Sequence, residues 1–151
     1  MTEPVEIHVD KDLDGSYDRV EATLREGPER WLPGFERSGD TITGELRFQR
    51  AGIRISRRTE VSVGPVQRFA DGVTVHVDWK GARHPEVYPE LDGHVRVERG
   101  RGGGTRLRFD ARYTPPAGGV GATVDRALMH SVAESSVRDF VERVATRLAG
   151  G

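Results

Sequence analysis

The sequence contains no cysteine, which removes thiol chemistry from any account of its function. Disulfide bridges, thiol nucleophiles and thiolate metal ligands are therefore excluded. Lysine occurs only at Lys11 and Lys80, so arginine carries almost all of the positive charge. No apolar run approaches the ~18 residues of a membrane helix, and the start, "MTEPVEIHVD", lacks the pattern of a signal peptide. We therefore expect no membrane span and a cytoplasmic protein.

An excess of charge of either sign is also missing. The chain has 23 basic and 24 acidic residues and a formal net charge of -1. This balance argues against nucleic-acid binding by bulk charge and against a polybasic membrane anchor. Apolar residues make up only 35% of the 151 residues, which predicts a core that is thin or partly open to solvent. We expect a single domain over residues 1–151.

Motifs that would indicate a particular chemistry are absent as well. The sequence has no G-x-S-x-G, no H-E-x-x-H and no pair of carboxylates at a recognisable spacing. The glycine-rich stretch "RGRGGG" at 99–104 is followed by a strand pattern and lacks the Lys-Ser/Thr of a phosphate loop. We interpret it as a flexible hairpin turn.

Histidines are the remaining candidates for metal ligands. Two of the five, His8 and His76, fall on the outer faces of predicted strands, and two more lie near turns. The fifth, His130, lies four residues before Glu134, but no third ligand accompanies this pair, and zinc sites normally need three protein ligands. We therefore expect neither a metal site nor a cofactor.

The first part of the chain predicts one strand and two short helices. Apolar and polar residues alternate over 4–10, which is typical of a half-buried strand. Asp14 or Ser16 can cap a helix that runs to about Arg25. Pro28 then begins a second short helix, "PERWL".

The rest of the chain changes from strands to one long helix. From about 35 to 113, alternating runs are separated by glycine-rich turns, which predicts about six antiparallel strands with one packed face and one solvated face. From about 120 to 148 the pattern is helical. Segregated strands and helices define an α+β fold. The simplest packing lays the long helix against the concave face of a curved sheet.

This order of elements resembles the START-like, or SRPBCC, superfamily. The local marks are "PERWLPGF" at 28–35 and "YTPP" at 113–116, which leads into the terminal helix. The superfamily is the helix-grip group that contains Bet v 1-type proteins and polyketide cyclases/dehydrases, and the resemblance covers essentially the whole chain. It implies about seven antiparallel strands gripping the C-terminal helix, two short helices closing one end, and a cavity for apolar or amphipathic small molecules. A fold does not by itself fix function.

The apolar stripe of the terminal helix changes direction half way along. In the second half it is formed by Val137, Phe140, Val141, Val144 and Leu148. Extended backwards, this stripe passes through Ala133 and His130, with Glu134 at its margin. On nearly the opposite side lie Val120, Val124, Leu128 and Val132. The first half therefore contacts a sheet edge, the two short helices or a second subunit. A homodimer through Val124, Leu128 and Val132 is one hypothesis.

Three polar residues are candidate contacts for the ligand. His130 and Glu134 are neighbours on the helix surface, and they form either a pair facing the cavity, for binding or acid/base chemistry, or an ordinary pair at the solvent edge. Arg57 shares a strand face with apolar residues. It is either an inward cation that pairs with a ligand carboxylate or with Glu134, or a residue that a β-bulge near "SRRT" returns to solvent.

Aromatic residues complete the set of candidates. Those on inward strand faces either pack the core or contact the ligand, and in a gripped cavity the two roles overlap; they are Phe48, Trp79, Phe109 and Tyr113. Trp31 either packs the short helix onto the sheet or gates the pocket. Tyr88, between two prolines in "HPEVYPEL", is a candidate for the pocket entrance.

The leading functional hypothesis is binding of a hydrophobic or amphipathic small molecule, such as a lipid or polyketide, between sheet and terminal helix. Apolar walls would supply affinity, and His130, Arg57 or Tyr113 would fix orientation. An enzyme of the cyclase/aromatase kind would need acid/base groups inside the cavity, for which His130 with Glu134 is the candidate pair. In a third alternative, side chains fill the grip and the chain is a protein-interaction module. A packed interior with a large exposed apolar patch would favour that alternative.

Overall fold

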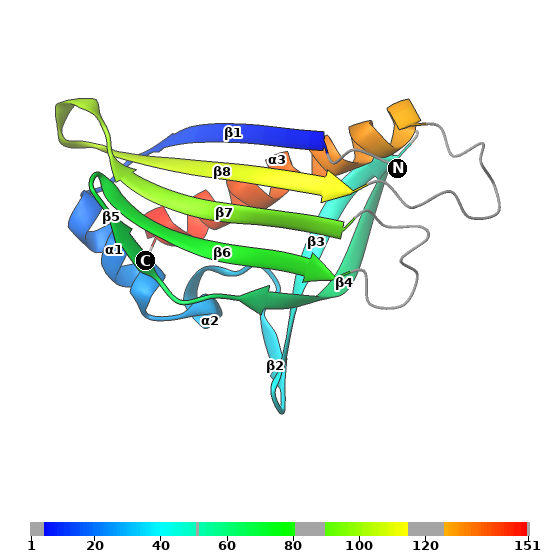
Figure 1. Ribbon diagram of the computed structural model, residues 1–151, viewed down its shortest axis with the longest axis horizontal. Helices are drawn as coiled ribbons and strands as arrows, with labels where there is room; N and C mark the ends of the chain where they lie inside the picture. Colours follow the sequence, from blue (N-terminus) through cyan, green and yellow to red (C-terminus); the bar gives the residue numbers. More distant parts are fainter. Residues whose placement is uncertain (1–4, 51, 81–89, 115–125, 151) are drawn as a thin grey trace.

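The computed structural model describes residues 5–50, 52–80, 90–114 and 126–150 (Figure 1). One antiparallel sheet contains all eight strands of this part, in the order β1-β8-β7-β6-β4-β3-β2, with β5 beside β6. The strands are β1 (Val5–Leu13), β2 (Glu36–Ser38), β3 (Thr41–Arg50), β4 (Ile53–Val63), β5 (Gln67–Phe69), β6 (Gly72–Lys80), β7 (Glu90–Arg99) and β8 (Thr105–Thr114). The helices are α1 (Tyr17–Arg25), α2 (Pro28–Trp31) and α3 (Arg126–Gly150), with a 3-10 turn at Arg101–Gly103.

The sheet curves around α3, and the predicted α+β helix-grip class is confirmed (Figure 1). Seven strands rather than about six follow the two short helices. Two of the seven, β2 and β5, have three residues each, too few to show an alternating pattern in the sequence. Within the described residues, no helix is long and apolar enough to cross a membrane.

Local sequence explains where the first elements begin and end. The hydroxyl of Ser16 accepts a hydrogen bond from the backbone N–H of Arg19, so Ser16 rather than Asp14 caps α1. Gly27 separates α1 from α2 with a φ of 119°, a backbone angle that favours glycine. Pro28 then occupies the first turn of α2, where its missing N–H costs nothing.

The concave face of the sheet is packed against the second half of α3. Trp79 and Phe109 both contact Phe140 of the helix, with ring centroids 5.0 Å apart in each pair. Side chains fill the space around Phe140 so closely that no water-sized void remains among the residues that line it: Val95, Leu107, Phe109, Phe140, Val141 and Val144. This half of the grip is therefore a solid core.

The two ends of the sheet hold α3 from opposite sides. On one side, Lys11 of β1 forms an ion pair with Glu142. On the other, the backbone N–H of Gln49 in β3 donates to the hydroxyl of Ser135 at 3.0 Å. Helix α3 makes more contact with β3 than with any other element. Helix α3 is thus buried around more of its circumference than the single apolar stripe of its second half would cover.

This grip explains the change in the apolar stripe. Val132 is only 5% exposed and shares a helix face with Ser136, near Ser135, on the side that meets β3. At Val132 and Ser135, the described residues nearest this change, the predicted contact with the sheet edge is found. Val132 is buried within the chain itself, so it is not available for the predicted dimer. The other two residues of that face, Val124 and the side chain of Leu128, lie outside the described part, and the dimer stays a prediction.

Candidate functional site

The β3–β4 hairpin continues past the end of β6. Val61 pairs with Trp79 near the end of β6. The next inward residue of β4, Thr59, pairs with Gly44 of β3 and lies beyond the last described pair of β4 with β6, Glu60 and Lys80. Beyond this point the two strands reach the first half of α3, as the Gln49–Ser135 hydrogen bond shows. Figure 1 shows this half of the hairpin rising beside the start of α3.

We call the inner side of this region the mouth. It lies between the far half of the hairpin, the last inward row of the sheet and the first half of α3. The described residues that form it are Phe48, Ile53, Ile55, Arg57, Thr59, Trp79, Tyr113, His130 and Glu134. Six of the nine candidate residues are therefore in the mouth. Trp31 and Phe109 are not, and Tyr88 lies outside the described residues.

Tyr113 and His130 are in contact across the gap between sheet and helix. The Tyr113 hydroxyl lies 3.4 Å from His130 Nδ1, and the two ring centroids are 5.9 Å apart. Tyr113 is only 2% exposed, and burial raises the pKa of its phenol above the ordinary value. The phenol thus stays protonated at neutral pH and can donate to Nδ1 or to a ligand.

A chain of polar contacts runs from His130 along the surface of α3. His130 Nε2 lies 3.6 Å from the Glu134 carboxylate, which also accepts a hydrogen bond from Arg138 at 3.1 Å. The side chains of His130 and Glu134 are 46% and 40% exposed. When Nδ1 accepts from Tyr113, the proton of a neutral imidazole is on Nε2, towards Glu134. The His130–Glu134 pair thus borders the mouth, where one side of it contacts the buried phenol of Tyr113 and the other side is exposed to solvent.

Arg57 lies in the mouth without a bulge. Pairing between β3 and β4 is continuous, with Leu46 opposite Arg57 and Phe48 opposite Ile55. Of the two alternatives for Arg57, the β-bulge near "SRRT" is therefore wrong. Arg57 keeps the inward register and is nevertheless exposed, because this part of the hairpin extends past the strands that would cover it.

The remaining aromatic candidates belong to the core. Phe109 lies in the packed half, and Trp31 is buried with its indole N–H unpaired. Phe48 is buried on the inner face of the hairpin, and Trp79 stands where the packed half meets the mouth. Of these four residues, Phe48 and Trp79 are therefore the ones that border the mouth.

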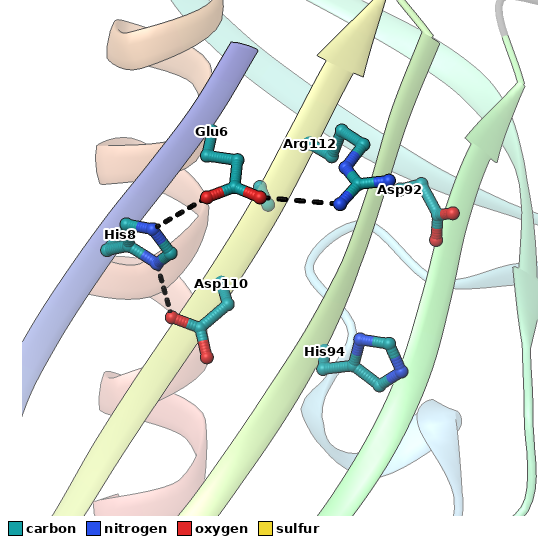
Figure 2. Close-up of a pocket in the computed structure, with 7 residues that line it drawn as sticks. Glu6, His8, Asp92, His94, Asp110 and Arg112 are labelled. Atoms are coloured by element: carbon teal, nitrogen blue, oxygen red, sulfur yellow. Dashed lines mark hydrogen bonds and ion pairs between the residues drawn. The ribbon is translucent and has the colours of Figure 1, made fainter. Parts of the chain in front are cut away.

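A second hollow lies on the outer face of the sheet, away from α3 (Figure 2). Its volume is about 250 Å³, and it is lined by Glu6, His8, Asp92, His94, Asp110, Ala111 and Arg112. His8 Nδ1 lies 2.6 Å from Asp110 and its Nε2 lies 3.6 Å from Glu6, which also pairs with Arg112 at 3.3 Å. The hydrogen bond with Asp110 is the main cause that raises the pKa of His8. These charges largely neutralise one another at an open surface.

The strand register extends this hollow into a row of imidazoles. His8, Asp110, His94 and His76 lie opposite one another across four adjacent strands. The rings of His76 and His94 are 5.0 Å apart, and His76 also contacts Asp92. Across the described chain, no three His, Asp or Glu side chains are arranged to hold a metal ion. We missed the row because His94 was expected near a turn, although the alternation in "GHVRVERG" places it on the outer face.

The outward arginines of β8 form a basic stripe beside acidic neighbours. Arg106, Arg108 and Arg112 pair with acidic residues of β1 at 3.6, 3.1 and 3.3 Å. The stripe is thus a solvated, charge-paired face.

Comparison with known proteins finds likeness in structure alone. Neither a family model nor a curated protein sequence matches the chain. Norcoclaurine synthase from Thalictrum flavum superposes with a TM-score of 0.62 at 10% identity, over 99% of this chain and 86% of that one. Ara h 8.0201 gives 0.53 at 10%, over 99% and 100%. A STAR-related lipid transfer protein from Xanthomonas axonopodis gives 0.53 at 15%, over 95% and 85%.

These structural similarities define the fold class of the chain. The chain is an α+β protein with a curved antiparallel sheet that grips its C-terminal helix. This is the fold of the START-like, or SRPBCC, superfamily, and the predicted resemblance is confirmed at the level of the fold. At 10–15% identity the likeness carries no ligand or reaction to this chain.

Proposed function

We propose that the chain binds a small apolar or amphipathic molecule in the mouth. The observation that carries this proposal is the contact between the buried Tyr113 phenol and the half-exposed His130 imidazole, at the boundary between packed core and open hairpin. Ligand sites commonly combine apolar walls with a few convergent polar groups. The mouth has both, because Ile53 and Ile55 of the hairpin present apolar surface and Tyr113 and His130 are the polar pair.

The packed half of the sheet–helix interface has no room for a ligand, so we expect the ligand to bind in the mouth. No water-sized void remains around Phe140, so a ligand there would have to displace core side chains. In the mouth, by contrast, Ile55 is only half-buried and Ile53 is 65% exposed. A ligand covering these side chains would remove apolar surface from water without rebuilding the core.

Two alternatives use the same features differently. An interaction module needs a large exposed apolar patch, whereas Ile53 is the one large apolar side chain exposed in the described part of the chain. An enzyme would use His130 and Glu134 as acid and base on the molecule that the mouth binds. Binding is therefore the function to test first, because catalysis at this site depends on it.

The test is fluorescence titration of the purified chain with 2-methylnaphthalene, together with native mass spectrometry for a molecule that co-purifies. For a ligand of this size we expect a Kd of roughly 10–100 µM. Ile53→Glu should weaken binding about tenfold or more, because the carboxylate would have to be desolvated beside the ligand. The matched control is Arg54→Glu, which places the same side chain on the opposite face of the same strand.

Three results would count against the proposal. The first is that the unmodified chain shows no saturable binding. The second is that no molecule co-purifies and the added ligand binds only weakly and non-specifically. The third is that Ile53→Glu and Arg54→Glu lose the same affinity. Since Ile53 is exposed, its substitution should leave the fold intact, and a circular dichroism spectrum checks this.

A further inference from the structure

The hydroxyl of Thr59 is buried on the inner face of β4 without a hydrogen-bond partner. The side chain is only 6% exposed, and its Oγ1 has no partner in the structure. Four polar side chains are buried in the described part of the chain, and the other three are satisfied. Thr23 donates to Arg19, Thr105 to Gly15 and Ser136 to Val132, at 3.0, 2.9 and 2.8 Å. Thr59 is thus the exception among them.

The surroundings of Thr59 place this hydroxyl beside the Trp79 ring, where the packed half of the sheet meets the mouth. Thr59 lies opposite Gly44, and a Cβ on Gly44 would come within 3.3 Å of the outer ring carbons of Trp79. The Trp79 ring therefore extends over Gly44, beside Thr59. Val61 and Trp79 form the last inward pair between β4 and β6 in the described residues. Thr59 is the first inward residue of β4 beyond that pair.

An unpaired buried hydroxyl lowers stability, because its hydrogen bonds to water are lost and not replaced. Valine has nearly the same shape and would avoid this cost at such a position. Threonine is therefore explained if the hydroxyl is paired in a complex. The apolar neighbours disfavour a charged partner, since desolvating an ion costs far more than desolvating a neutral polar group.

We propose that Thr59 is the hydrogen-bonding contact for a neutral oxygen of the ligand, a hydroxyl or a carbonyl, carried on an apolar body that lies against Trp79. This inference rests on the proposed function and names the ligand class: flat or compact apolar molecules with an uncharged hydrogen-bonding group. Because Thr59 and Tyr113 lie on β4 and β8, with β6 and β7 between them, the ligand's oxygen at Thr59 is separate from any group at the Tyr113–His130 pair.

The first test uses the chain without added ligand. Thr59→Val should leave the Tm unchanged or raise it, because the valine removes an unpaired hydroxyl. The matched control is Thr105→Val, which removes a buried hydroxyl that donates to the Gly15 carbonyl and should lower the Tm by roughly 3–6 °C. If Thr59→Val lowers the Tm as much as Thr105→Val does, the hydroxyl is already paired and the proposal is overturned.

The second test compares 2-naphthol, which carries a hydroxyl, with 2-methylnaphthalene, which does not. Thr59→Val should weaken binding of 2-naphthol by about 3- to 10-fold, the effect of one neutral hydrogen bond. It should leave binding of 2-methylnaphthalene within about twofold, and Thr59→Ser should retain the affinity for 2-naphthol.

The two proposals fail differently. If the unmodified chain binds neither naphthalene, the proposed function fails and the role of Thr59 fails with it. If both naphthalenes bind and Thr59→Val changes neither affinity, the mouth is a binding site and the role of Thr59 alone is overturned. Equal weakening of both naphthalenes also overturns it, since the effect would then be one of shape.

Discussion

The hydroxyl of Ser135 on α3 accepts a hydrogen bond from the backbone N–H of Gln49 on β3, at 3.0 Å. Strand β2 pairs only with residues 41–43, and the next N–H on this edge, that of Glu45, donates to the Pro33 carbonyl at 2.9 Å; beyond it, no described strand pairs with this edge of β3. Further along the helix, Arg143 donates to the backbone carbonyl of Glu45 at 3.1 Å. The helix thus pairs edge groups that would otherwise be open to another strand, in addition to packing on the concave face.

Ser135→Ala, compared with a control, should show how much the hydrogen bond from the Gln49 N–H contributes to stability, apart from the effect of alanine on helix propensity. Alanine favours a helix more than serine does, so Ser131→Ala, at an exposed position one turn earlier, should be neutral or slightly stabilising. Relative to that control, we expect Ser135→Ala to lose about 0.5–1.5 kcal/mol in the free energy of unfolding, measured with urea. Equal values for both variants would show that the Gln49 N–H is satisfied by water.

Gly93→Ala should disturb the core through Phe109. A Cβ at Gly93 would lie 2.7 Å from Phe109 Cζ and 2.9 Å from the carbonyl oxygen of Asp110. Because the second of these is backbone, the sheet itself must shift, and we expect a loss of about 1–3 kcal/mol by urea unfolding. The control is Gly104→Ala, whose nearest neighbour would be 4.0 Å away. A Gly93→Ala variant as stable as this control would contradict the packing described.

Tyr17→Phe should flatten the pH dependence of stability at high pH. Burial, with a smaller contribution from the hydrogen bond to Glu21, raises the pKa of Tyr17 to about 12. An unfolded tyrosine ionises near pH 10. Above that pH the unfolded chain therefore gives up a proton that the folded chain retains, and stability falls as the pH rises towards 12.

Tyr17→Phe should also change the pH dependence of stability at low pH. The hydrogen bond from Tyr17 is the largest cause that lowers the pKa of Glu21 below 4.5. This stabilisation is present above about pH 4.5 and is lost as the pH falls through the folded pKa. Midpoints of urea unfolding at a series of pH values from 3 to 11 measure both the high-pH and the low-pH change in stability. Parallel curves for the parent chain and Tyr17→Phe would contradict both assignments.

The sequence predicted the fold class well because alternation reports directly which strand face is buried. Val5, Ile7 and Val9 of β1 face the same side as Tyr113, Ala111 and Phe109 of β8, as their alternation required. Alternation does not report how far one strand extends beyond its neighbour. That extension, which creates the mouth, is a property of the register between β4 and β6.

The candidate site was therefore only partly predictable. His130, Glu134 and Tyr113 were identified as candidates, and the structure brings them together. For Arg57 the sequence left two alternatives, an inward cation or a residue returned to solvent by a bulge; the structure keeps the inward register and exposes Arg57 without a bulge. Thr59 was not singled out, because a threonine among valines in a strand gives no signal until its missing hydrogen bond is seen.

Asp110→Asn should lower the pKa of His8. The imidazole Nδ1 lies 2.6 Å from the Asp110 carboxylate, and this hydrogen bond is the largest cause that raises the pKa of His8 above 6.5. Because the folded pKa is raised, the stabilisation is fully present below about pH 6.5 and is lost as the pH rises through the folded value. Titration of the His8 ring protons by NMR measures the shift. Asp12→Asn is the control, since Asp12 pairs with Arg106 on the same face, and an unchanged His8 titration in Asp110→Asn would refute the pairing.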